Sequence, residues 1–256
     1  MVEQSPELCW PTLSQPYDLA LRKAVAFIIE AYEPVGIIAA GSILRGKPDP
    51  SSDLDLYVIH LSPWRQRLQR WFNGVPTEVF VNPPQAIREY LRDEWRERRP
   101  RTAHMLTTGH IVLDGDPVVA ALRAEADASM ASPPPAPKDL TMERYGLALL
   151  YEDAVDVAER DPDAAQMIAS QAVTALIGHC FVQRGLFLPR EKDALTALGN
   201  LDPAAARLAR AFHWAGSIEE ALDVAGALCE RVVGAKGFFA WDSPRDEIGS
   251  DVDGEN

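Results

Sequence analysis

The sequence predicts an α+β protein in which a domain with a mixed sheet is followed by an all-α helical bundle. In residues 1–131, apolar segments of strand length occur among helical patterns, whereas residues 140–243 contain helical patterns alone. Residues 132–139, SPPPAPKD, contain four prolines, which exclude a helix and favour an extended spacer. We therefore expect a first domain at 1–131, a linker at 132–139, a helical domain at 140–243 and an acidic flexible tail at 244–256.

The first domain opens with a helical pattern at 17–32, where apolar residues recur every three or four positions. Apolar runs of strand length then follow at 36–42, 54–60, 77–82 and 110–113. Three further stretches have the spacing of amphipathic helices, and we expect helices at 64–73, 84–98 and 117–128.

The second domain carries explicit signals for helix starts. Asp161 and Asp202 each precede a proline, which places a capping side chain before a residue that suits the first helical turn. Ser217 and Glu220 have the spacing of a capping box. We expect about five helices in this domain.

The composition of this 256-residue chain is that of an ordinary globular protein. The three cysteines form no paired motif, so we expect reduced thiols, and the absence of a signal sequence or a membrane span favours a cytoplasmic protein. The net charge of −13 is uneven: residues 1–128 carry −3 and residues 129–256 carry −10. Because such an acidic surface repels a polyphosphate backbone, long nucleic acid is a poor candidate partner.

Two carboxylates stand at the start of the strand predicted at 54–60. Side chains alternate along a strand, so Asp53 and Asp55 point the same way with Cα atoms roughly 6 to 7 Å apart. Magnesium ions prefer such oxygen ligands, and paired ions stabilise the attacking and leaving oxygens of a phosphoryl displacement. Glu78, at the head of the next alternating strand, is the expected third carboxylate.

Gly41 and Ser42 follow a strand at a point where a turn into a helix would present backbone N–H groups to an anion. The glycine permits close approach of a phosphate. Arg45, three residues after the serine, adds a charge suited to a triphosphate. These residues are expected to bind nucleotide phosphates.

The ordered pattern of Gly41, Ser42, Arg45 and Gly46, followed by Ser52, Asp53, Asp55 and a later Glu78, resembles the nucleotidyltransferase superfamily built on the DNA polymerase β palm. The resemblance implies that Gly41, Ser42, Arg45 and Ser52 bind the nucleotide. It implies that Asp53 and Asp55 bind Mg²⁺, with Glu78 as a further ligand or as the base toward the acceptor hydroxyl. The layout of a small catalytic domain and a helical domain resembles the aminoglycoside adenylyltransferases, and the Arg-Gly variant resembles minimal nucleotidyltransferases.

The expected activity is Mg²⁺-dependent transfer of a nucleoside monophosphate, with ATP the expected donor of AMP, to an acceptor hydroxyl. The acidic second half favours a small polar or cationic acceptor such as an aminoglycoside. Two alternatives stay open: AMP transfer to a protein acceptor, as in antitoxins, and a nucleotide-binding protein without catalysis on this fold.

Three other groups of charged residues have functional interpretations beside an ordinary surface interpretation. Arg88, Arg92 and Arg96 lie on one face of a predicted helix, and the pattern is typical of either a phosphate patch or surface ion pairs. The carboxylates at Glu152, Asp153 and Asp156 could hold a substrate amine or be solvated. Lys192, near Arg190 at a predicted helix start, is a candidate ligand for nucleotide phosphate.

Overall fold

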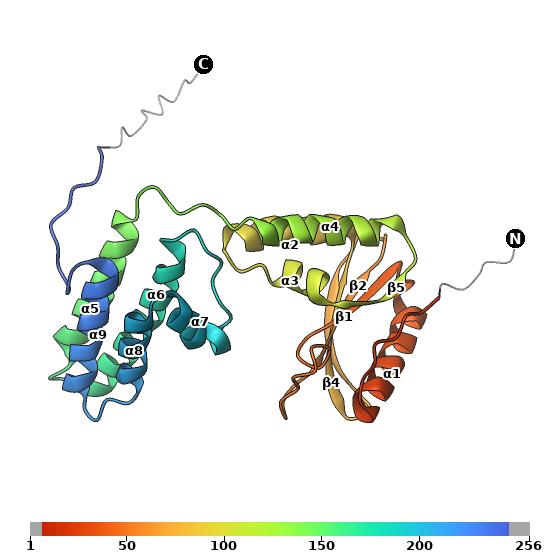
Figure 1. The fold of residues 1–256 in the computed structure, drawn as a ribbon, viewed down its shortest axis with the longest axis horizontal. Helices are drawn as coiled ribbons and strands as arrows, with labels where there is room; N and C mark the ends of the chain where they lie inside the picture. The colour runs from red at the N-terminus through yellow and green to blue at the C-terminus, as the bar shows by residue number, and fades with distance from the viewer. Residues whose placement is uncertain (1–6, 246–256) are drawn as a thin grey trace, which may run out of the picture. The chain divides into compact units, whose positions relative to one another are not determined.

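A computed structural model of the chain describes residues 7–245 and divides them into two compact units (Figure 1). The first unit extends through Pro135 and includes the short segment Gly185–Phe187. The second comprises Ala136–Arg184 and continues from Leu188. The division falls inside the proline-rich stretch 132–139, but no sequence signal marks Gly185–Phe187 as part of the first unit. The expected acidic tail lies outside the described residues except for its first two positions.

The first unit contains a five-stranded sheet in the order β3-β4-β2-β1-β5. The strands β2 and β4 pair in parallel, and the other neighbours are antiparallel, which confirms the predicted mixed sheet. In chain order, the strands are β1 (Gly36–Ala40), β2 (Leu54–Ile59), β3 (Gln66–Phe72), β4 (Val75–Asn82) and β5 (His110–Asp114).

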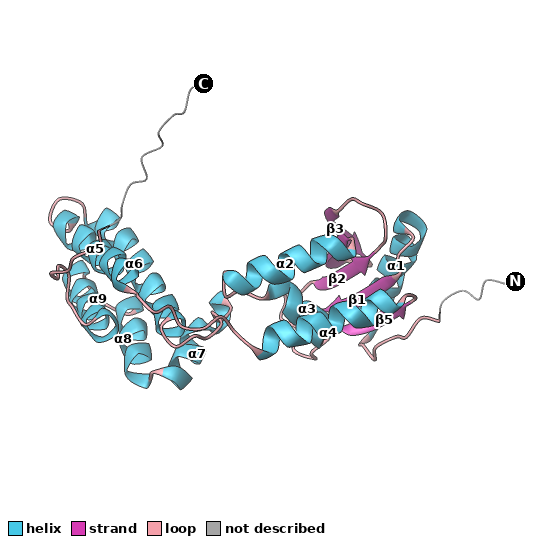
Figure 2. Cartoon of the chain, turned by 90° about the horizontal axis from the view of Figure 1, so that it is seen from above, coloured by secondary structure: helices cyan, strands magenta, loops and turns pink. Residues whose placement is uncertain are grey.

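Helices cover both faces of this sheet (Figures 1 and 2). Leu56 and Val58 of β2 face a core that includes residues of α1 (Gln15–Tyr32). Tyr57 and Ile59 face the opposite core, which residues of three other helices complete. These helices are α2 (Pro84–Arg96), α3 (Arg101–Thr108) and α4 (Pro117–Ala131). Because side chains alternate along β2, its carboxylate at Asp55 lies on the same face as Tyr57.

The helix predicted at 64–73 is wrong, because Gln66–Phe72 forms the edge strand β3. Its apolar residues also fit a helical spacing, which is why the pattern misleads. The decisive local signal is Asn73-Gly74, which joins β3 to β4 in a two-residue hairpin loop. Both residues have positive φ, 51° and 76°, as a type I′ turn requires. Helix α3 was likewise not predicted.

The second unit contains helices only, apart from connecting segments, as the sequence predicts. The predicted caps are confirmed: Asp161 accepts from the Ala164 N–H, Asp202 from those of Ala204 and Ala205, and Ser217 from that of Glu220. The helices are α5 (Thr141–Val157), α6 (Pro162–Val182), η1 (Glu191–Asp193), α7 (Ala194–Leu201), α8 (Pro203–His213) and α9 (Ile218–Val233).

Helix α6 is the one helix within 7–245 whose length and apolar composition would allow it to cross a membrane. The sequence was expected to contain no such segment. Half of the apolar window in α6 is buried within the structure, however, and its buried residues include Val173, Leu176 and Phe181. The central helix of a soluble bundle has the same properties, so α6 is weak support for a membrane span.

Candidate metal and nucleotide site

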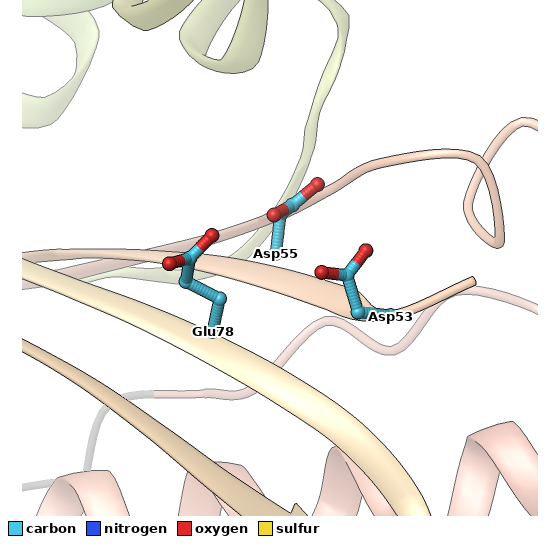
Figure 3. Close-up of side chains that lie close together, drawn as sticks. All are labelled: Asp53, Asp55 and Glu78. Atoms are coloured by element: carbon cyan, nitrogen blue, oxygen red, sulfur yellow. The ribbon is translucent and has the colours of Figure 1, made fainter. Parts of the chain in front are cut away.

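Three carboxylates meet at one end of the central strands, as the sequence predicts. Asp55 is the second residue of β2 and pairs directly with Glu78 of β4 in the parallel register. Asp53 lies immediately before β2, two residues from Asp55 and on the same face. One oxygen from each of the three carboxylates lies within 4.8 Å of the others (Figure 3). The sheet therefore brings together three hard oxygen donors.

The negative charge of this cluster is poorly compensated. No residue within 7–245 donates a hydrogen bond to the side chain of Asp53 or of Asp55. The pKa of Asp55 is raised from 3.8 to about 6, chiefly by burial and then by the charges of Asp53 and Glu78, while Arg45 and Arg67 oppose the rise. A group that loses its hydration without gaining a donor is easier to protonate. A cation placed here would supply the missing counter-charge.

Gly41 is required where β1 turns toward this cluster. It has a φ of +94°, and a Cβ at this position would lie 2.7 Å from Oδ2 of Asp55. An alanine would therefore combine an unfavourable backbone conformation with displacement of the carboxylate. Besides the expected role toward phosphate, Gly41 thus leaves room for the Asp55 carboxylate.

The hydroxyl groups of Ser42 and Ser52 lie 2.7 Å apart and hydrogen-bond to each other. The Asp49 N–H donates to the Ser52 hydroxyl at 2.8 Å. The segment after Gly41 forms successive turns and not the helix start that the sequence argument considered, with a bond from the Lys47 N–H to the Ser42 carbonyl. The turns nevertheless bring the two predicted nucleotide-binding serines together beside the carboxylates.

Two residues of β3, which the sequence analysis did not predict as site residues, contact the cluster. Arg67 donates from Nε to Oε1 of Glu78 at 2.7 Å, and its Nη2 forms an ion pair with the same oxygen at 2.5 Å. Gln69 donates from Nε2 to the same oxygen at 3.1 Å. They were missed because 64–73 was interpreted as a helix. The Asn73-Gly74 hairpin signal would have placed Gln69 opposite Glu78.

The two remaining predicted site residues, Arg45 and Lys192, are exposed. Arg45 is exposed in the turn after β1, and its charge lowers the pKa of Asp55. Lys192 is an exposed residue of η1 in the second unit, and no contact among the described residues of that unit groups it with other phosphate ligands. Arg190, beside it, pairs with Asp193.

Three residues of the other charged groups, Arg88, Arg96 and Glu152, have structural partners. Arg88 forms a bidentate pair with Glu125 of α4, and Arg96 pairs with Asp93. In the second unit, the Phe238 N–H donates to Glu152 at 2.9 Å, while Asp153 and Asp156 are exposed. The contacts of Arg88 and Arg96 fit the surface interpretation of the arginines. Of the carboxylates Glu152, Asp153 and Asp156, only the last two are exposed.

The donor set of the cluster fits a hard divalent cation. Carboxylate oxygens are the ligands that Mg²⁺ prefers, and the cluster offers at least three without nitrogen or sulfur. Burial and the neighbouring carboxylates raise the pKa of Asp55, and a bound cation would favour its charged form. Asp53, Asp55 and Glu78 would hold such an ion, and Gly41, Ser42 and Ser52 lie beside it.

Comparison with known proteins supports the same fold. No family model and no curated protein sequence matches the chain. Among solved structures, a nucleotidyltransferase-like protein from Exiguobacterium sibiricum matches 84% of this chain and 73% of its own, with a TM-score of 0.51 and 16% identity. The chain thus shares its fold with this nucleotidyltransferase-like protein. At this identity, the likeness concerns the fold.

Proposed function

We propose that the protein is a Mg²⁺-dependent nucleotidyltransferase that moves AMP from ATP to an acceptor hydroxyl. The observation that carries the proposal is the convergence of Asp53, Asp55 and Glu78, with ligand atoms within 4.8 Å, on a nucleotidyltransferase-like fold. The raised pKa of Asp55 adds an independent argument, because strongly shifted carboxylates are concentrated at functional sites.

The proposed reaction is an in-line displacement at the α-phosphorus. The acceptor oxygen forms a bond to phosphorus, the bond to the β-phosphate oxygen breaks, and pyrophosphate leaves with its electron pair. The bound cation would supply neutralisation of charge on the phosphate oxygens. Asp53 and Asp55 orient the reactants by holding that cation, and Glu78 either completes the ligand set or accepts the hydroxyl proton.

The nucleotide phosphates are proposed to lie against Gly41, Ser42, Ser52 and Arg45. The glycine leaves room beside Asp55, and the two hydroxyls are already held at 2.7 Å from each other. Arg45 is exposed and its charge lowers the pKa of Asp55, so its guanidinium is the proposed partner for a bound anion. Lys192 is a further candidate phosphate ligand, which Lys192→Met in the label-transfer assay below would test.

The acceptor is proposed to be small and cationic, as an aminoglycoside is, and the protein to act in the cytoplasm. The support is the charge of −10 in residues 129–256, where Asp153 and Asp156 are exposed and solvated. Glu152, the other candidate to hold a substrate amine, instead accepts from the Phe238 N–H. A protein acceptor is the alternative outcome of the experiment below.

The test is label transfer from ATP carrying a labelled α-phosphate, with Mg²⁺, to a panel of aminoglycosides and to proteins of a cell lysate. The wild type should produce a labelled product and pyrophosphate. Asp53→Asn combined with Asp55→Asn should reduce the rate roughly 10³-fold or more, because the charge that holds the cation is removed. Label on a protein band would favour the protein acceptor. Absence of both products with every acceptor would contradict the proposed chemistry.

A further inference from the structure

The edge strand β3 presents two polar side chains to the third carboxylate. Gln69 is the direct cross-strand partner of Glu78, and Arg67 is the partner of Phe80, two residues further along β4. The guanidinium of Arg67 lies 4.8 Å from the centre of the Phe80 ring while it donates to Glu78. Arg67 is therefore held by two contacts, although 66% of its side chain is exposed.

All the donors to Glu78 converge on one of its oxygens. Nε and Nη2 of Arg67 and Nε2 of Gln69 each contact Oε1. No donor among residues 7–245 reaches Oε2. In Figure 3, one carboxylate oxygen of Glu78 lies on the side of Asp55 and the other is directed away from it. The contacts thus fix the carboxylate by one oxygen and leave the second available.

We propose that Arg67 and Gln69 are positioning residues that orient Glu78 as a ligand for a divalent cation shared with Asp53 and Asp55. A glutamate has three rotatable side-chain bonds, so a free one would lose conformational entropy when it binds an ion. Donors on β3, which lies on the side of β4 opposite β2, fix Oε1 and reduce that loss, in the way that outer-shell partners orient metal ligands generally. This inference rests on the proposed function, since it requires that the three carboxylates bind a cation.

The positioning role predicts that removal of Arg67 weakens cation binding, whereas a purely electrostatic role predicts tighter binding. The positive charge of Arg67 opposes a cation bound at the cluster, so removing the charge without any positional effect would tighten cation binding. If Arg67 orients Glu78, removing it weakens binding despite the lost repulsion. Gln69 carries no charge, so its removal tests orientation alone. The sign of the change in affinity therefore separates the two roles.

The experiment is titration of the full chain with Mn²⁺, with free Mn²⁺ followed by electron paramagnetic resonance. Arg67→Met and Gln69→Met should each weaken binding by roughly 10-fold, within the range of 10 to 100-fold that loss of such partners typically produces. Arg67→Lys, which keeps the charge and one donor, should fall between the wild type and Arg67→Met. Arg70→Met is the matched control, because Arg70 is on the opposite face of β3 and stacks on Phe27.

The outcomes distinguish this inference from the proposed function. A wild type that binds no Mn²⁺ would overturn the metal-dependent function, and the positioning role with it. Wild-type binding with unchanged or tighter binding in both Met variants would overturn the positioning role alone. Circular dichroism checks folding, and if Arg67→Met does not fold, Gln69→Met, a change at an exposed edge position, decides the question.

Discussion

Two carboxylates in the two units show opposite surroundings. Asp55, in the first unit, has a pKa raised to about 6 by burial and then by its neighbours Asp53 and Glu78. Asp202, in the second unit, is the N-cap of α8 and has a lowered pKa. Burial acts to raise the pKa of Asp202 as well, but its hydrogen bonds more than offset that effect.

The difference lies in the donors. Asp202 accepts from the backbone N–H groups of Ala204 and Ala205 and forms a bidentate pair with Arg231. Burial and the charges of Asp53 and Glu78 act on Asp55 more strongly than the opposing charges of Arg45 and Arg67.

The carboxylate of Asp202 thus stabilises the fold of the second unit, whereas that of Asp55 destabilises the fold of the first. A buried carboxylate with a raised pKa reduces folding stability at neutral pH, because its charged form is disfavoured in the folded state. Such local conflicts are concentrated at functional sites, where they persist because the activity needs them. The contrast can be tested by removing each charge in turn.

The largest expected effect is a gain of stability from Asp55→Asn. The pKa of Asp55 is raised from 3.8 to about 6, so its destabilising effect is complete above pH 6 and disappears as the pH falls toward 4. At pH 7.5, the variant should be more stable than the wild type by about 1 to 3 kcal/mol, and the gain should shrink to near zero at pH 4. Urea denaturation at the two pH values measures both.

The control for Asp55→Asn is Asp156→Asn, which removes the same charge from an exposed position of α5. Its free energy of unfolding should stay within about 0.5 kcal/mol of the wild type. Equal gains in the two variants would mean that net charge, and not the surroundings of Asp55, determines the effect.

Asp202→Ala should lower the free energy of unfolding, by about 2 kcal/mol. Loss of an N-cap costs about 0.5 to 2 kcal/mol, and the partly exposed pair with Arg231 adds about 0.2 to 1 kcal/mol. Asp163→Ala, at an exposed position in the first turn of α6, is the control and should be nearly neutral. Unfolding followed by circular dichroism compares them, and similar losses in both would contradict the assigned role of Asp202.

The smallest expected effect is a difference of about 1 kcal/mol between Gly41→Ala and Gly46→Ala, measured by urea denaturation. Both glycines have positive φ, +94° and +69°, so an alanine is strained by about 1 kcal/mol at either position. Only at Gly41 would the new Cβ meet the Asp55 carboxylate, at 2.7 Å, whereas no atom lies within 4 Å at Gly46. Gly41→Ala should also weaken Mn²⁺ binding, and equal binding by the two variants would argue against displacement of Asp55.

Sequence patterns predicted the central part of the sheet because its signals are local. The alternation around Asp55 and Glu78 placed both side chains on one face, and the register confirms this by pairing them directly. The edge strand β3 was mistaken for a helix because five of its seven residues are exposed, so little burial constrained its pattern. Arg67 and Gln69 were lost with it.

The sequence by itself determined the fold class, the helix starts at Asp161, Asp202 and Ser217, and the three carboxylates of the cluster. Each depends on side-chain alternation or on capping within a few residues, which are properties of a short segment. Only the tertiary structure decided that β2 and β4 are parallel neighbours and that β3 supplies the donors to Glu78. Strand order and charge compensation depend on residues far apart in the chain, which local patterns do not encode.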